Sequence, residues 1–291
     1  MQKYALLLLL GFLWAARLSA IKAAGNTGAP IHAIIALSVF GIAIVFTVIA
    51  LARGRWPKFD RATTPFYIVS ALLGFILPFA LENVTAPNLS VFALIVIIST
   101  MPVITVLLAM RLRVEPVQRR QILSVLFGFA VAVAIAFDTA EGAGDEKLSW
   151  FWVALAFAIP VLYALNTLFV VSRWPRGADA IQVSQAQAMI LSAAILVGGF
   201  LSGSADAWKI AALQPSTIVA ISVTEAFALL VYLKVARDFG ASFVALANYV
   251  SMVFAAIIGA YLFGDKLTWL SGLAGVLLVI ALSMSVSRKT A

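Results

Sequence analysis

The sequence contains no cysteine and only one histidine, His32. Without cysteine, disulfides, thiolate nucleophiles and cysteine metal sites are excluded. A single histidine with few carboxylates in the apolar segments also argues against a metal centre or a histidine-dependent enzyme. We therefore expect a protein that is not an enzyme and that has no metal or other cofactor.

Charged residues are scarce as well, at 11% of the 291 residues, whereas 64% are hydrophobic. A soluble domain carries about 25% charged residues, which it needs to cover its core. The net charge of +8 does not indicate a nucleic-acid partner, because the basic residues lie in short clusters between apolar runs rather than on one face. The composition thus predicts an all-α integral membrane protein whose main partner is the lipid bilayer.

Ten apolar runs approach the length of about 20 residues that crosses the hydrocarbon core of a bilayer. We expect them at residues 4–23, 31–52, 65–83, 89–110, 121–138, 150–172, 180–201, 216–235, 242–263 and 268–287. The first run resembles a secretory signal, but Arg17 interrupts the region of cleavage, so we interpret it as the first helix. The connecting segments are too short for a soluble domain.

The basic residues alternate with the spans. One set of loops contains fifteen Lys and Arg residues: Lys3, Arg53, Arg55, Lys58, Arg61, Arg111, Arg113, Arg119, Arg120, Arg173, Arg176, Lys234, Arg237, Arg288 and Lys289. The alternate loops contain four: Lys22, Lys147, Lys209 and Lys266. Because basic loops stay in the cytoplasm, this pattern predicts that both termini are cytoplasmic. We expect a multi-pass protein of the bacterial inner membrane.

The two halves resemble each other at an offset of 150 residues. Residues 102–115 and 252–265 each form an apolar helix that ends in a carboxylate, Glu115 or Asp265, directly before the next span. Five spans per copy is an odd number, so the second copy has to be inverted in the membrane. We predict inverted five-helix repeats at residues 1–140 and 141–291, an architecture typical of secondary transporters.

Two short segments carry a resemblance to a family. They are Gly240-Ala241-Ser242 leading to Tyr249-Val250, and Gly259-Ala260-Tyr261-Leu262-Phe263-Gly264-Asp265-Lys266-Leu267. With Pro102 and Glu115-Pro116 as the first-half copy, they resemble the pattern of EamA-type transporters of the drug/metabolite transporter superfamily. Met252, where that pattern has a proline, and Asp265, where it has a glutamate, depart from it. The resemblance implies two five-helix EamA repeats and the transport of a small metabolite, and many members export their cargo.

Two opposite charges lie deep in predicted spans. Arg17 follows Lys3 by about 21 Å of helix, and Glu225 follows Pro215 by about 15 Å, at a rise of ~1.5 Å per residue. A charge at the bilayer centre costs about 2.5–3.5 kcal/mol on insertion scales, so each needs a partner or a function. Trp14 shares the helical face of Arg17. We predict a polar pocket with an aromatic wall; an ion pair that only locks two helices is the alternative.

Other polar residues are weaker candidates for the same pocket. They are Tyr163 and Asn166 in the sixth span, and Asn248 and Tyr249 in the ninth. Pro102 and Pro160 are candidate hinges, because proline removes a helical hydrogen bond. Glu82, His32 and Lys22 are expected near the outer surface. Gln182, Gln185 and Gln187 are expected on a peripheral helix, an expectation that the family resemblance implies.

These residues lead to one functional hypothesis. We expect a secondary active transporter that works by alternating access, most simply an exporter of an amino acid or a similar zwitterion. Arg17 would bind the carboxylate and Glu225 the ammonium group, and Glu225 could also exchange protons as a coupling ion. The alternatives are an importer of a neutral aromatic vitamin such as riboflavin, and an uncoupled channel or membrane scaffold. The sequence leaves open whether the protein is a monomer or a homodimer.

Overall fold

The computed structural model describes residues 2–25, 30–85, 88–89, 97–139, 150–201, 205–264 and 276. In these ranges the ordered elements are helices, and no strand is present. They are α1 (Gln2–Gly25), α2 (Ile31–Arg53), α3 (Thr64–Ala71), η1 (Leu72–Ile76), α4 (Leu77–Thr85), α6 (Met101–Leu112), α7 (Arg119–Thr139), α8 (Trp150–Arg173), α9 (Ala180–Leu201), α10 (Ala205–Ala211), α11 (Pro215–Phe239), α12 (Ala241–Ala245) and α13 (Ala247–Phe263).

Seven helical segments of the described chain are long and apolar enough to cross a membrane. They are Gln2–Ala24, His32–Arg53, Thr64–Glu82, Trp150–Arg173, Ala180–Gly199, Pro215–Phe239 and Ala241–Phe263. A shorter apolar helix covers Ile97–Leu112, and α7 coincides with the expected fifth span. The expected tenth span, 268–287, lies almost wholly outside the described residues. An all-helical membrane architecture is therefore confirmed, and the count of ten spans stays a prediction.

The third span changes its helical type in the middle. Residues Leu72–Ile76 form one turn of π-helix between α3 and α4. Pro78 lies two residues after it; proline has no N–H to donate to the carbonyl of Gly74, and its ring crowds that carbonyl. A wider turn relieves this crowding, and such turns are often found at functional sites. Gly74 also lies against the amide of Asn166, where a β-carbon would approach Nδ2 to 2.5 Å.

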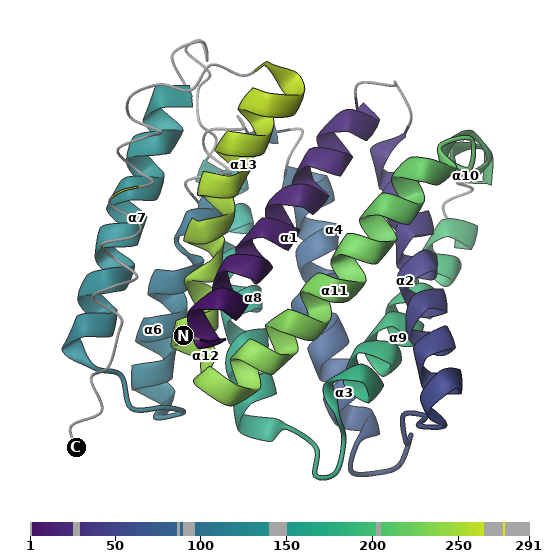
Figure 1. The fold of residues 1–291 in the computed structure, drawn as a ribbon, viewed down its shortest axis with the longest axis horizontal. Coiled ribbons are helices and arrows are strands. Elements are labelled where there is room, and N and C mark those ends of the chain that lie inside the picture. The colour runs from purple at the N-terminus through teal and green to yellow at the C-terminus, as the bar shows by residue number, and fades with distance from the viewer. Residues whose placement is uncertain are drawn as a thin grey trace.

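Helices from the two halves of the sequence are interleaved (Figure 1). Helix α1 packs between α11 and α13, and α2 packs between α11 and α9. Helix α8 contacts α4 and α6. The approach of α2 to α11 requires a residue without a side chain at Gly41, since a β-carbon there would lie 2.1 Å from Oγ of Ser222. That hydroxyl donates to the carbonyl of Ser38 on α2 at 3.0 Å.

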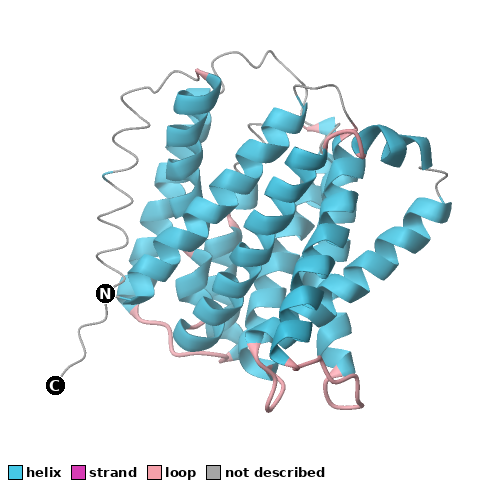
Figure 2. Ribbon diagram, turned by 45° about the vertical axis from the view of Figure 1, so that its right-hand side comes forward, coloured by secondary structure: helices cyan, strands magenta, loops and turns pink. Residues whose placement is uncertain are grey.

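The loops of the predicted cytoplasmic set lie together at one end of the bundle, the bottom in Figures 1 and 2. We call this the basic end; it comprises the loops 54–63, 113–118 and 174–179 and the α11–α12 junction at Gly240. In the first loop, backbone N–H groups of Thr63 and Ala62 donate to the carboxylate of Asp60 and lower its pKa. The common position of these loops agrees with the alternation of basic residues in the sequence.

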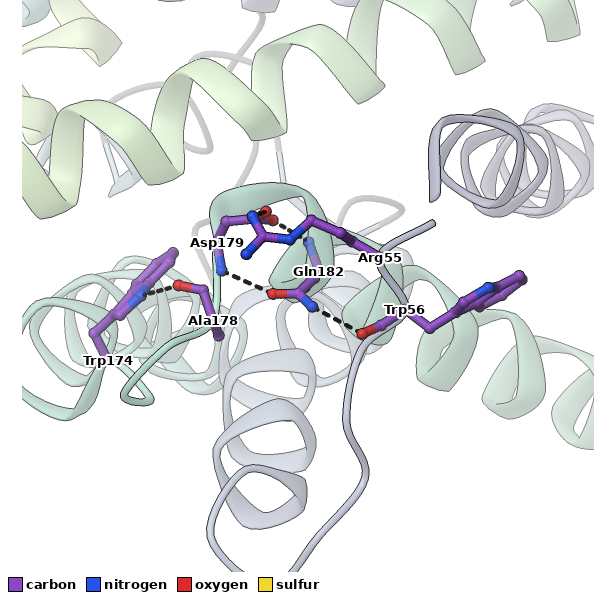
Figure 3. A network of polar contacts seen from close by, with 6 residues as sticks. All are labelled: Arg55, Trp56, Trp174, Ala178, Asp179 and Gln182. Atoms are coloured by element: carbon purple, nitrogen blue, oxygen red, sulfur yellow. Dashed lines mark hydrogen bonds and ion pairs between the residues drawn. The ribbon is translucent and has the colours of Figure 1, made fainter. Parts of the chain in front are cut away.

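A polar network at the basic end joins the α2–α3 loop to the start of α9 (Figure 3). The N–H of Gln182 donates to Asp179 Oδ1, and the N–H of Asp179 donates to Gln182 Oε1, which is a reciprocal cap of the helix start. The Gln182 amide also donates to the carbonyl of Trp56 at 2.8 Å, and Arg55 lies 3.2 Å from Asp179. The cap of one helix thus holds a distant loop in place.

The main hydrophobic core occupies the halves of the helices nearer the basic end. Its fully buried side chains include Leu7, Leu10, Phe46, Tyr67 and Leu233. A smaller core cluster of Ala24, Ala33, Ile34, Ala211 and Ile221 lies in the opposite halves of these helices. The main core forms a floor, and the cavity described next lies above it.

Candidate functional site

A cleft lies between α1, α2, the α3–η1–α4 segment, α8, α9 and α11. The space between these helices, counted with its opening to solvent, amounts to about 760 Å³. Its lining residues are Arg17, Ile35, Ser38, Val39, Ile42, Phe75, Phe79, Glu82, Tyr163, Gln187, Ala188, Leu191, Ile195, Ile221, Glu225 and Leu229. Most of these are apolar, so the few polar groups decide which ligand can be oriented there.

Arg17 and Glu225 meet in this cleft. Nε of Arg17 lies 3.2 Å from Oε2 of Glu225, and the side chains are 31% and 16% exposed. The two atoms form an ion pair by distance, but neither has an aligned hydrogen-bond partner. A buried charge pair is strongest when hydrogen bonds satisfy both partners. The pair therefore keeps unused hydrogen-bonding capacity inside the cleft.

Glu82 and Tyr163 form a second polar contact in the cleft. The hydroxyl of Tyr163 donates to Oε1 of Glu82 at 2.9 Å. Glu82, expected near the outer surface, instead lines the cleft together with Arg17 and Glu225. It faces inward because it continues the face of Phe79 and Phe75, which lie one turn and two turns earlier, respectively, along the same span. The spacing alone could have indicated this, had the interior face of that span been known.

Gln187 supplies a third polar group. Its side chain is 2% exposed, and its amide donates to Oγ of Ser70 at 2.8 Å. The Ser70 hydroxyl donates onward to the carbonyl of Tyr67, so it has to accept from the Gln187 NH₂ group. The other end of the amide, Oε1, is buried and has no partner. With Gln182 and Gln185 also buried, α9 is not the peripheral helix that the sequence interpretation expected.

Asn166 and Trp14 lie near the cleft but are not among its lining residues. Asn166 is 4% exposed, packs on Gly74, and has no partner for its Oδ1. Trp14 packs against the ring of Tyr232, with 6.3 Å between centroids. The Tyr232 hydroxyl lies 3.0 Å from that of Thr167. These groups occupy the level of the floor, toward the basic end from Arg17 and Tyr163.

Asn248 and Tyr249 are placed in helix contacts away from the cleft lining. The amide of Asn248 donates to the sulfur of Met101 at 3.0 Å. The hydroxyl of Tyr249 donates to the carbonyl of Val125 at 3.1 Å, and its ring covers Gly128. The structure therefore brings together Arg17, Glu225 and Tyr163 of the predicted residues, and does not place these two with them.

The two candidate hinges occupy different positions in their helices. Pro160 lies inside α8, where the missing N–H leaves the carbonyl of Ala156 without its helical partner. Pro102 lies in the first turn of α6, where a proline leaves no hydrogen bond unmade. Pro102 also lies within the apolar helix Ile97–Leu112, two residues after the turn at Thr100 that precedes α6.

Comparisons with known proteins agree with this architecture. Residues 1–137 match the EamA-like transporter family. A protein of Bacillus subtilis (strain 168), described as the uncharacterized transporter YvbV, is 27% identical over 248 residues, which cover 85% of this chain and 79% of that protein.

A solved crystal structure shares the fold with a TM-score of 0.74 at 17% identity, over 98% of this chain and 95% of the other. Among the described residues, no group of three His, Cys, Asp or Glu side chains could hold a metal ion. The family match, the related transporter and the apolar helices confirm the resemblance found in the sequence. Residues 1–137 thus match the EamA-like transporter family, in agreement with the resemblance to EamA-type transporters of the drug/metabolite transporter superfamily.

Proposed function

We propose that this protein is a secondary active transporter that moves an amino acid or a similar zwitterion, most simply as an exporter. The observation that carries the proposal is the Arg17–Glu225 pair inside an otherwise apolar cleft. Opposite charges 3.2 Å apart, without an aligned hydrogen bond, match the opposite charges of a zwitterion. Arg17 would bind its carboxylate and Glu225 its ammonium group, each through charge-assisted hydrogen bonds.

The surrounding cleft suits an apolar side chain of such a cargo. Phe75, Phe79 and Tyr163 provide aromatic surface on one side, and Ile42 and Leu229 provide aliphatic surface. Asn166 and Trp14 would contact cargo only when the floor opens, because they lie below the lining. Asn248 and Tyr249 stay predictions, since α13 would have to move for either to reach the cargo.

Alternating access would occur between two inverted repeats, residues 1–140 and 141–291. The similarity at an offset of 150 residues supports this division, and the packing of α1 against α11 and α13 provides an interface between the halves. Pro160 is a candidate hinge within α8, and Pro102 one at the start of α6. Glu225 is the candidate for proton coupling, since it would lose its charge partner whenever Arg17 engages cargo.

The orientation follows from the positive-inside rule. The basic end would face the cytoplasm, with both termini on that side of a bacterial inner membrane. The cleft lies away from the basic end and would therefore face the outside in this conformation. The packed floor of Leu7, Leu10, Phe46, Tyr67 and Leu233 would close the cytoplasmic side.

One alternative also has support from the lining. A neutral aromatic vitamin such as riboflavin could stack on Phe75, Phe79 and Tyr163, and Arg17 and Glu225 would then only neutralise each other. An uncoupled channel or scaffold is a third reading; saturable flux and counterflow in proteoliposomes would distinguish a carrier from it.

The deciding experiment replaces the charge pair. Removing one partner of a buried pair strands the other charge, at a cost of about 3–5 kcal/mol, so both single Leu variants should fold poorly. The double variant Arg17→Leu with Glu225→Leu should fold and reach the membrane. We expect it not to transport amino acids in whole-cell efflux assays, with membrane abundance measured in parallel. A double variant that transports at the wild-type rate would reduce the pair to a structural contact.

A further inference from the structure

The polar groups of the cleft are unequally divided between donors and acceptors. Arg17 is the one cationic donor among the lining residues. The hydroxyl of Ser38 donates to the carbonyl of Ile34, and that of Tyr163 donates to Glu82, so both donors are already used. The acceptors comprise the carboxylates of Glu82 and Glu225 and the amide oxygen of Gln187. A ligand that satisfies this cleft therefore has to bring more donors than acceptors.

The charged groups of the cleft lining are also unequal in number, with two carboxylates and one guanidinium. Arg17 and Glu225 compensate each other at 3.2 Å. Glu82 accepts a hydrogen bond from the neutral phenol of Tyr163, and it forms no ion pair among the described residues. With both carboxylates ionised, the lining carries one more negative than positive charge. Burying a carboxylate in an apolar cleft is costly unless a cation or a proton neutralises it.

The side chain of Gln187 indicates independently that the ligand brings a hydrogen-bond donor. Its Oε1 belongs to a side chain that is 2% exposed, lines the cleft and has no hydrogen-bond partner. The contact between its NH₂ group and Ser70 fixes the amide so that this oxygen is the free end. An unpaired buried acceptor is destabilising, and a ligand N–H group would satisfy it. An ammonium group has three such donors and a guanidinium has five.

From these observations we infer that the cargo carries a net charge of +1: a carboxylate for Arg17 and two cationic nitrogen groups, one of which binds Glu82. The cargo class is therefore a basic amino acid with a long aliphatic chain, rather than a neutral one. This inference rests on the proposed transport of amino acids. Glu82 is the residue that would select for the second cation, and Glu225 would bind the α-ammonium group beside Arg17.

The test compares two amino acids that differ in one amine. L-lysine and L-norleucine have the same aliphatic chain, and only lysine carries the terminal ammonium group. Binding of each to the purified full-length protein is measured by thermal shift. Transport of each is measured as uptake into proteoliposomes. We expect the wild type to prefer lysine by at least about tenfold in Kd. The Glu82→Gln variant should lose that preference and still bind norleucine, and Tyr163→Phe should weaken lysine binding less. Asp206→Asn removes an exposed carboxylate outside the cleft and should leave the preference unchanged.

Three results would overturn the inference. The first is equal affinity of the wild type for both amino acids, and the second is an unchanged lysine preference in Glu82→Gln. The third is norleucine binding that strengthens as the pH falls from 7.5 to 5.5 in the wild type but not in Glu82→Gln. A proton would then occupy Glu82, which faces Arg17, Tyr163 and Glu225, in place of a second ammonium group.

A different result separates this inference from the proposed function. If neither amino acid binds, the comparison is repeated with phenethylamine and phenethyl alcohol, which have no carboxylate. A preference for the amine that Glu82→Gln abolishes would keep the cationic cargo and overturn the amino-acid proposal. No preference between these two probes would overturn both.

Discussion

Glu115 caps the helix that begins in the other half of the chain, accepting the backbone N–H of Ser242 at 2.7 Å. Its second oxygen accepts the N–H of Ala241 at 2.9 Å. Gly240, just before them, has a φ of +92° and leaves room for the carboxylate, since a β-carbon there would lie 2.3 Å from Oε2. The end of the first-half motif thus meets the Gly240-Ala241-Ser242 segment of the second half at the basic end.

Replacing Glu115 should destabilise the fold. Glu115→Ala removes both acceptors and leaves the first N–H groups of α12 without partners, at a cost of about 1–2 kcal/mol. Glu115→Gln keeps one acceptor, so its loss should be smaller. Thermal unfolding of the purified variants in detergent measures the difference. Equal midpoints for Glu115→Ala and the wild type would show that the cap contributes nothing.

Gly11 should be intolerant of any side chain. A β-carbon at Gly11 would lie 2.4 Å from a methyl group of Val250, so Gly11→Ala would force α1 away from α13. Such overpacking costs about 1–3 kcal/mol. Gly198→Ala is the matched control, because nothing lies within 4 Å of its β-carbon position. We expect the control to unfold at or slightly above the wild-type temperature, since alanine favours a helix; a larger loss in the control than in Gly11→Ala would contradict this packing.

Two residues of the network in Figure 3, Gln182 and Arg55, should contribute unequally to the stability of the fold. Gln182 is 9% exposed and joins Asp179 to Trp56, so Gln182→Ala should cost about 1–3 kcal/mol through unmet hydrogen bonds. The Arg55 side chain is 63% exposed, and an exposed ion pair contributes less than about 1 kcal/mol. Chemical or thermal unfolding should therefore rank Gln182→Ala well below Arg55→Ala in stability. The reverse order would show that the charge, rather than the helix cap, holds the loop.

Reporter fusions test the orientation. Fusions after Arg61, Arg120 and Arg176 should report cytoplasm, because these residues lie in or next to the loops of the basic end. Fusions after Ala207, and after Glu146 outside the described residues, should report periplasm. Paired reporters active on opposite sides of the membrane give each position an internal control. One reproducible reversal among the five positions would disprove the ten-span topology.

The sequence by itself indicated that lipid surrounds the protein, that its apolar runs are helices, and that its motifs resemble those of EamA-type transporters. Its apolar runs could form only helices in lipid, because every backbone N–H and C=O group has to be paired within the membrane. The alternation of basic loops and the depths of Arg17 and Glu225 are also local properties, since a helix rises by a fixed length per residue. The contact between those two charges followed from depth and opposite sign.

Only the tertiary structure decided which face of each span points inward. Membrane helices lack a strong difference between a polar and an apolar face, because the lipid side and the packed side are both apolar. Glu82 and Gln187 therefore went unrecognised as cleft residues, while Asn248 and Tyr249 looked equivalent to Tyr163. Rotation of each helix is set by close contacts such as Gly41 against Ser222 and Gly11 against Val250, which join residues far apart in the chain.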